Sequence, residues 1–94
     1  MKNKITEEVE RALGNPVKLR ILRALAMSSS QALTKYELER KTYAKPTSLR
    51  RNLNELIALG WVEELPYTPR RYRLNLNNDT LRSLLKFFKD VHYI

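Results

Sequence analysis

The sequence predicts a mainly helical domain with one small β-hairpin, an α+β fold. Residues 34–60 carry two short amphipathic helical patterns that are separated by a tight connection. After Gly60 the apolar pattern changes to the alternation that is typical of strands, and a helical pattern returns at Asp79. Because 94 residues suffice for one modest core, we expect residues 1–94 to form a single domain.

The first two helices are predicted from their end signals. Thr6 is the expected N-cap of the first helix, and Gly14 is expected to end it because glycine readily adopts the left-handed conformation. Asn15 followed by Pro16 then combines a capping amide with a proline at the first helical position. Apolar residues cover most of the helix from Pro16 to about Met27, so we expect it to be the most buried helix.

A third helix is predicted to follow a very short strand at residues 32 and 33. Thr34 and Glu37 have the spacing of a capping box, in which each side chain satisfies a free donor at the start of a helix. Leu38 is the clearest inward-facing residue of this helix. Two aromatic residues are candidates to pack beside it, Tyr36 and Tyr43.

The fourth helix is predicted to begin at Pro46, after Lys45, and to end at Gly60. At about 100° per residue, one face is apolar and must be buried. That face contains Leu49, Leu53, Leu56 and Ile57. The opposite face contains Thr47, Ser48, Arg51 and Asn54, with Arg50 and Asn52 at its flanks. Hydroxyl, amide and guanidinium groups pair with base edges and phosphates, although a polar helix face can also serve solubility alone.

Two strands are predicted at residues 61–65 and 71–76, joined by a proline-containing loop at residues 66–70. Alternation places Tyr72, Leu74 and Leu76 on one face of the second strand, and Arg71, Arg73 and Asn75 on the other. A basic hairpin therefore follows the basic helix. The alternative interpretation is an ordinary solvated edge hairpin.

The last helix is predicted from Asp79 to about Tyr93, with Asn78 as its N-cap. Its apolar stripe either lies across the first helix of the same subunit or pairs with a symmetry mate. We favour a homodimer that forms through residues 78–94. The predicted interface residues are Leu81, Leu84, Leu85, Phe87, Phe88 and Val91.

Charge favours a polyanionic partner. Eighteen Lys and Arg residues against ten Asp and Glu residues give a net charge of +8, so nucleic acid is the leading partner class. An anionic membrane surface is the competing partner. However, the N-terminal sequence lacks the apolar run of a signal peptide, and no stretch approaches the roughly 18 apolar residues of a membrane-spanning helix. We therefore expect a cytoplasmic protein that does not enter membranes.

Reactive and metal-binding residue types are scarce. The chain has no cysteine and one histidine, His92, and a single imidazole does not supply the several convergent ligands of a metal site. Paired carboxylates, a Ser/His/Asp set and a phosphate-binding glycine loop are all missing from the sequence. We expect no enzyme activity, no metal and no cofactor.

The predicted order is helix, helix, strand, helix, helix, strand, strand, helix, which is that of a winged helix-turn-helix domain. Residues 13–22, LGNPVKLRIL, are similar to the opening motif LGNPTRLRIL of the ArsR-type regulators. Residues 47–53, followed by the pattern of residues 56–62, resemble the recognition helix of that family and its exit into the hairpin. The chain more loosely resembles the MarR and PadR groups of winged-helix repressors.

The resemblance implies a dimeric DNA-binding regulator whose recognition helix enters the major groove. It places Thr47, Ser48 and Arg51 at base-facing positions, and Arg70, Arg71 and Arg73 on the hairpin. The sequence departs from the metal-sensing members of the family. Where those members carry a cysteine pair this chain has Tyr36, Glu37, Leu38 and Glu39, and the last helix offers only Asp90 and His92. Metal sensing is therefore not expected.

Together these patterns predict a sequence-specific regulator that binds double-stranded DNA. The predicted DNA-binding residues are Lys45, Thr47, Ser48, Arg50, Arg51, Asn54, Arg70, Arg71 and Arg73. The alternative is a winged-helix module that docks to another protein through its apolar last helix. The concentration of basic residues on the fourth helix and the hairpin favours DNA.

Overall fold

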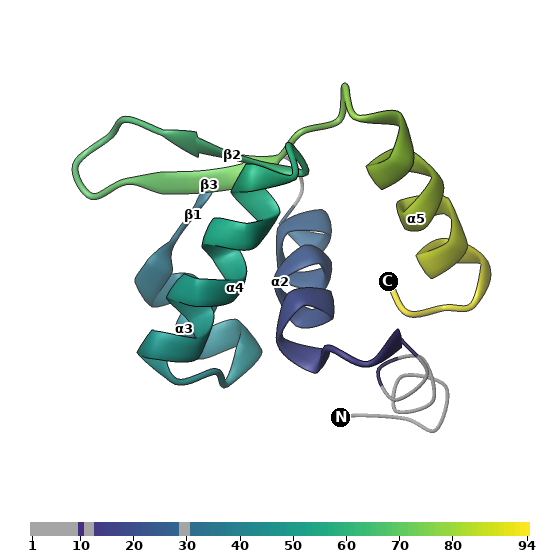
Figure 1. The fold of residues 1–94 in the computed structure, drawn as a ribbon, viewed down its shortest axis with the longest axis horizontal. Coiled ribbons are helices and arrows are strands. Elements are labelled where there is room, and N and C mark those ends of the chain that lie inside the picture. The colour runs from purple at the N-terminus through teal and green to yellow at the C-terminus, as the bar shows by residue number, and fades with distance from the viewer. Residues whose placement is uncertain (1–9, 11–12, 29–30) are drawn as a thin grey trace.

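The computed structural model describes residue 10 and residues 13–28 and 31–94. This part of the chain contains four helices and a three-stranded antiparallel sheet, and the hairpin of the sheet projects from one side of the molecule (Figure 1). The elements are α2 (Pro16–Met27), β1 (Leu33–Thr34), α3 (Lys35–Thr42), α4 (Pro46–Ala58), β2 (Val62–Leu65), β3 (Arg71–Leu74) and α5 (Asp79–Asp90). The predicted α+β class and element order are confirmed for these residues.

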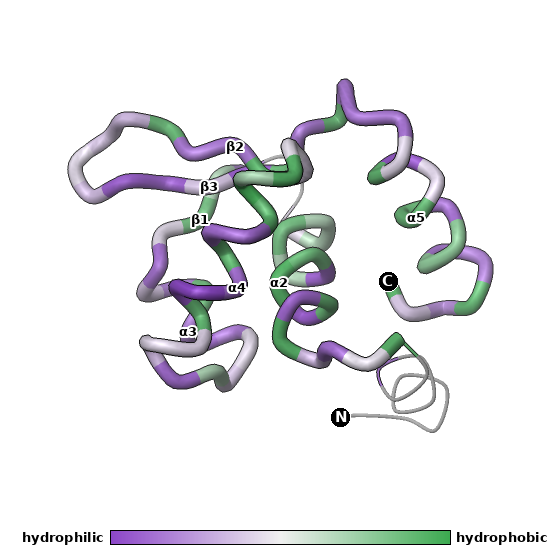
Figure 2. Tube along the Cα trace, viewed as in Figure 1, coloured by the Kyte–Doolittle hydropathy of each residue, from purple (hydrophilic) through white to green (hydrophobic). Residues whose placement is uncertain are grey.

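Helix α2 lies at the centre of the fold, with α3 and α4 on one side and α5 on the other (Figure 1). Asn15 caps it as predicted, because its side-chain oxygen accepts a hydrogen bond from the Lys18 amide at 3.1 Å. Four of its side chains are buried: Leu19, Ile21, Leu22 and Leu25. Apolar residues accordingly dominate α2 in the hydropathy view (Figure 2).

Helices α3 and α4 form the predicted helix-turn-helix. The capping box is present, since the Glu37 amide donates to Thr34 Oγ1 at 3.2 Å and the Thr34 amide donates to Glu37 Oε1 at 2.9 Å. Leu38 is fully buried, as predicted. The prediction that Tyr36 or Tyr43 packs beside Leu38 was wrong, because both rings are exposed. Tyr43 is the C-cap of α3 in the left-handed region (φ 58°), where the chain turns its ring outward.

Helix α4 buries the predicted apolar face. Leu49, Leu53 and Leu56 are at most 1% exposed, and Ile57 packs against the same core. Gly60 ends this segment with φ +78°, and its amide donates to the Ile57 carbonyl oxygen at 2.9 Å. A residue with a side chain rarely adopts that φ, so the glycine is required where α4 turns into the hairpin.

The sheet has the order β1-β3-β2, and β3 pairs antiparallel with both neighbours. Tyr72 is paired with Leu33 and is 2% exposed, so the inner face of the sheet joins the core. Leu76 was predicted on the same face, but it is exposed because β3 ends at Leu74 and the chain turns before it. Below, the hairpin formed by β2, β3 and residues 66–70 is called the wing.

Helix α5 starts at the predicted cap, where Asn78 Oδ1 accepts from the Leu81 amide at 3.0 Å. Leu81 and Phe88 are fully buried in the core of the same chain, so in this arrangement their side chains offer no surface to a second copy. The helix also ends earlier than predicted, at Asp90. His92 has φ 62°, and this reversal returns Tyr93 to the core with no exposed surface.

Tyr93 belongs to a buried polar cluster that joins both ends of the described chain. Its hydroxyl donates to Glu10 Oε2 at 2.9 Å, and its ring packs edge-on against Phe88. Arg20 binds the same carboxylate through Nε and Nη2, at 3.2 and 3.1 Å. Burial is the main cause that raises the pKa of the Tyr93 hydroxyl, and the Glu10 carboxylate raises it further. The cluster therefore favours a neutral Tyr93.

The N-cap predicted at Thr6 lies outside the described residues. Gly14, the predicted end of that first helix, has φ +80°, and its amide donates to the Glu10 carbonyl oxygen at 3.1 Å. This hydrogen bond is the kind that closes a helix, so the predicted stop at Gly14 is confirmed.

Tyr93→Phe should lower the free energy of unfolding by about 1 to 3 kcal/mol at pH 8, because Glu10 loses a buried donor. Since the pKa of folded Tyr93 is raised, its contribution is present below about pH 10, where the unfolded tyrosine begins to ionise, and is lost as the pH rises further. Urea unfolding from pH 8 to 11 should therefore show the two proteins converging. An offset that stays constant over this range, or an equal effect of Tyr67→Phe in the exposed wing loop, would contradict the assignment.

Candidate nucleic-acid interface

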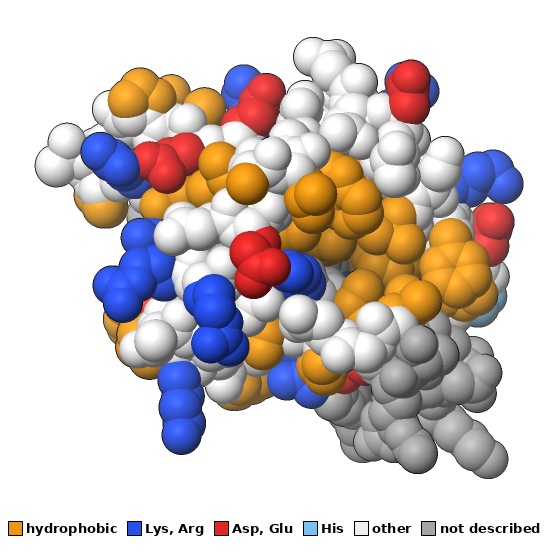
Figure 3. Space-filling model, viewed as in Figure 1, with side chains coloured by type: hydrophobic (Ala, Val, Ile, Leu, Met, Phe, Trp, Pro, Cys, Tyr) orange, Lys and Arg blue, Asp and Glu red, His pale blue; other side chains and the backbone are white. Residues whose placement is uncertain are grey.

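One side of the molecule carries α3, α4 and the wing (Figure 1). Lysine and arginine side chains gather on this side, whereas apolar side chains form a patch between α2 and α5 (Figure 3). Eight of the nine predicted DNA-binding residues are exposed, and Ser48 is half-buried. All nine side chains are thus at least partly accessible to solvent.

The exposed face of α4 is built by the burial of its opposite face. Once Leu49, Leu53 and Leu56 are packed in the core, Arg50 and Arg51 must project into solvent. Neither arginine has a described carboxylate within 4.0 Å. Their charges are therefore available to an external anion.

Asn52 is not at the flank of the polar face, as the helical pattern predicted, but is only 5% exposed. Its side chain donates to the Ser48 carbonyl oxygen at 2.8 Å and accepts a hydrogen bond from Asn15 at 3.2 Å. These bonds explain how a polar side chain is accommodated beside the leucines of α4.

The wing is less cationic than its three arginines suggest. Arg70 Nη1 lies 2.7 Å from Glu64 Oε2, and Arg73 Nε lies 2.8 Å from Glu63 Oε2. The second pair follows from the strand register, in which residues 63 and 73 face each other. Arg71 forms no ion pair within 4.0 Å with a carboxylate of the described residues. Its charge still acts within the chain, because the pKa of Glu37 is lowered mainly by the hydrogen bond from the Thr34 amide and further by Arg71.

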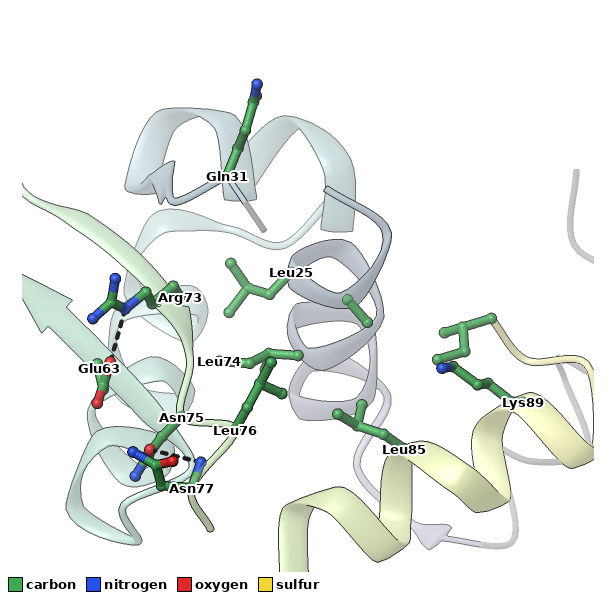
Figure 4. A pocket seen from close by; sticks show the side chains of 12 residues that line it. Leu25, Gln31, Glu63, Arg73, Leu74, Asn75, Leu76, Asn77, Leu85 and Lys89 are labelled. Atoms are coloured by element: carbon green, nitrogen blue, oxygen red, sulfur yellow. Dashed lines mark hydrogen bonds and ion pairs between the residues drawn. The ribbon is translucent and has the colours of Figure 1, made fainter. Parts of the chain in front are cut away.

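Arg73 lies at the base of the wing, beside a groove of about 480 Å³ that separates β3 and α2 from α5 (Figure 4). Leu25, Leu74 and Leu85 line this groove, and the Lys89 side chain reaches toward it from α5. The Arg73–Glu63 ion pair stands at the edge of the groove.

The sequence patterns missed several residues that shape this surface. Glu63 and Glu64 were not considered as partners of the wing arginines. On α3, Arg40 is exposed and its guanidinium lies 5.7 Å from the Tyr36 ring centre, which adds a cation beside α4. A signal for the burial of Asn52 was available, because positions 49, 52, 53 and 56 follow the spacing of a helix face.

The described residues contain no group of three or more His, Asp or Glu side chains arranged to hold a metal ion. None of the described helices has the length and apolar character that crossing a bilayer requires.

Solved structures with the same architecture are MarR-family transcriptional regulators. One from Silicibacter pomeroyi superposes with a TM-score of 0.72 and 20% identity, over 94% of this chain and 62% of that chain. The chain has a winged-helix fold. Wild-type MarR from E. coli gives a TM-score of 0.68 at 19% identity, over 95% of this chain and 70% of that one. A mutant of E. coli MarR in complex with operator DNA gives 0.66 at 20% identity, over 95% and 67%.

This winged helix spans about three fifths of the length of the Silicibacter regulators. The structural similarity is to MarR proteins, so the closer resemblance to ArsR-type regulators inferred from the opening motif is not supported. No protein-family profile and no curated protein sequence matches the chain. At about 20% identity, the comparison establishes the fold.

Arg51→Ala should change the free energy of unfolding by no more than about 0.5 kcal/mol, because the side chain is exposed and has no described ion-pair partner. Arg20→Ala should cost about 2 kcal/mol or more, since it leaves the Glu10 carboxylate without its bidentate arginine. Urea denaturation monitored by circular dichroism measures both. A loss above about 1 kcal/mol for Arg51→Ala would mean that this arginine supports the fold.

Proposed function

We propose that this winged helix is a transcriptional regulator that binds specific sequences of double-stranded DNA. In this proposal, α4 enters the major groove, and the wing contacts the phosphate backbone or the minor groove. The observation that carries it is that α4 and the wing lie on the same side of the molecule (Figure 1) and that Arg50, Arg51 and Arg71 are all exposed.

The geometry of α4 suits base reading. Thr47, Arg51 and Asn54 project from the face opposite the buried leucines. A guanidinium can bind the O6 and N7 atoms of guanine together, and hydroxyl and amide groups can contact bases or phosphates. Lys45 and Pro46 stand at the N-terminus of α4, the end that contacts base edges in helix-turn-helix complexes.

The comparison with solved structures supports the same function. The E. coli MarR mutant of similar fold was crystallised with operator DNA. The similarity covers 95% of this chain.

We further propose that two copies associate through α5, so that two α4 helices face successive major grooves. Phe87 is 43% exposed, and Leu84 and Val91, three residues before it and four after it on the same side of α5, are half-buried. An exposed aromatic ring beside such residues is a usual component of a protein interface. Recognition helices about 34 Å apart would read an imperfect palindrome.

Arg51→Ala should cost about 1 to 3 kcal/mol of binding free energy at one base pair, because a bidentate guanine contact is lost. Arg71→Ala should instead weaken binding to all sequences alike and lower the salt slope by about one unit, because a phosphate contact is lost. Selection from a random duplex pool, followed by fluorescence anisotropy at several salt concentrations, measures both effects.

Arg82→Ala, at an exposed position on α5, is the matched control and should leave both quantities unchanged. If Arg51→Ala alters neither affinity nor base preference, α4 is not the reading helix. If the wild-type chain does not retain random duplex even at about 50 mM salt, the protein-docking alternative is favoured.

Phe87→Ala should shift the protein from dimer to monomer and lower operator affinity, because the exposed centre of the proposed α5 interface is lost. Light scattering coupled to size exclusion measures the mass directly. Tyr67→Ala removes an aromatic ring of similar exposure from the wing loop and should leave the mass unchanged. A wild-type protein that is monomeric at all concentrations would refute this interface.

A further inference from the structure

A partly buried chain of side-chain hydrogen bonds connects the start of α2 to the polar face of α4. Asn52 is 5% exposed and lies among the leucines that anchor α4 in the core. Asn15, the N-cap of α2, is 37 residues away in sequence, and its Nδ2 lies 3.2 Å from Asn52 Oδ1. Asn52 Nδ2 in turn lies 2.8 Å from the Ser48 carbonyl oxygen and 3.4 Å from Ser48 Oγ.

The chemistry of the neighbours fixes the direction of every bond in this chain. The Lys18 amide can only donate, so Asn15 must turn its oxygen toward it and its Nδ2 toward Asn52. The Ser48 carbonyl can only accept, so Asn52 must turn its Nδ2 toward Ser48 and its oxygen toward Asn15. The two amides are therefore oriented in series.

The orientation of the Asn52 amide determines where the Ser48 hydroxyl can donate its proton. Asn52 Nδ2 points a donor at Ser48 Oγ, so the hydroxyl proton is not directed back toward Asn52. Ser48 is half-buried on the first turns of α4, between the core and the exposed basic face. Its proton is thus directed away from Asn52.

We propose that Asn15 and Asn52 are positioning residues that hold Ser48 as a hydrogen-bond donor to the DNA. This inference rests on the proposed DNA-binding function. A donor at this point favours an acceptor, such as purine N7, guanine O6 or thymine O4. Asn15 and Asn52 act on sequence preference without touching a base.

The competing explanation is that the two asparagines only fasten α4 to α2. Asn15→Ser separates the two roles. Serine caps a helix about as well as asparagine, so α2 keeps its cap. However, serine Oγ is one bond closer to the backbone than the amide nitrogen of asparagine, so it does not replace the hydrogen bond to Asn52. Asn15→Thr serves as a second variant of the same kind.

The experiment uses a duplex that the wild-type chain selects from a random pool, and a set of single-base variants of that duplex. Affinities are measured for the wild type, Asn15→Ser, Ser48→Ala and the double variant, each verified by its thermal melt. We expect Ser48→Ala to relax the preference at one base pair by about five- to tenfold, the value of one hydrogen bond. Asn15→Ser should relax the same base pair by a similar factor and leave random-duplex affinity unchanged.

Non-additivity is the decisive result. If Asn15 acts through Ser48, the double variant should discriminate no worse than Ser48→Ala alone. Two results would overturn the proposal in favour of a structural role. In the first, the double variant loses base discrimination by the product of the two single factors. In the second, Asn15→Ser lowers affinity for every duplex by the same factor. If the wild type selects no sequence at all, the proposed function of sequence-specific DNA binding fails. This outcome can be told apart from a purely structural role of Asn15, in which the wild type still selects a sequence.

Discussion

The burial of one face of α4 is the constraint on which the rest of the structure depends. Leu49, Leu53 and Leu56 are almost completely buried. The burial of each leucine side chain contributes about 1.5 to 3 kcal/mol to the free energy of folding. A helix cap contributes about 1 kcal/mol, and an exposed ion pair such as Lys18–Glu55 contributes less. The leucines therefore decide the rotation of α4 about its axis. Every proposed contact of its basic face follows from that rotation.

Local signals in the sequence were sufficient to predict most of the fold. The cap at Asn15, the capping box at Thr34 and the stop at Gly60 each depend on residues within a few positions, and the structure confirms them. Two of the errors have different causes. Tyr93 was placed at the end of a helix because its partner Glu10 is 83 residues away in sequence. Asn52 was placed at the flank of the polar face, although its spacing from Leu49, Leu53 and Leu56 already indicated the buried face.

The net charge of the sequence likewise predicted only part of the candidate site. The net charge of +8 predicted an affinity for polyanions, but it could not show where the charge is available. Only the antiparallel register brings Glu63 opposite Arg73, and that register depends on how the loop of the wing closes. The exposure of Arg50 and Arg51, by contrast, followed from helical geometry alone. The α4 part of the surface was thus more predictable than the wing.

The contact between Tyr93 and Glu10 also bears on how the chain folds during synthesis. Helices α2, α3 and α4 are close in sequence, with only the short strand β1 between α2 and α3, and their contacts can form as soon as residue 60 has left the ribosome. The Glu10 carboxylate must wait for Tyr93, so the nascent protein passes through a stage in which the helix-turn-helix is assembled while the α5 side of α2 is still open to chaperones. The core is therefore completed late, and the time of its completion depends on when Tyr93 is synthesised rather than on how fast the helices form.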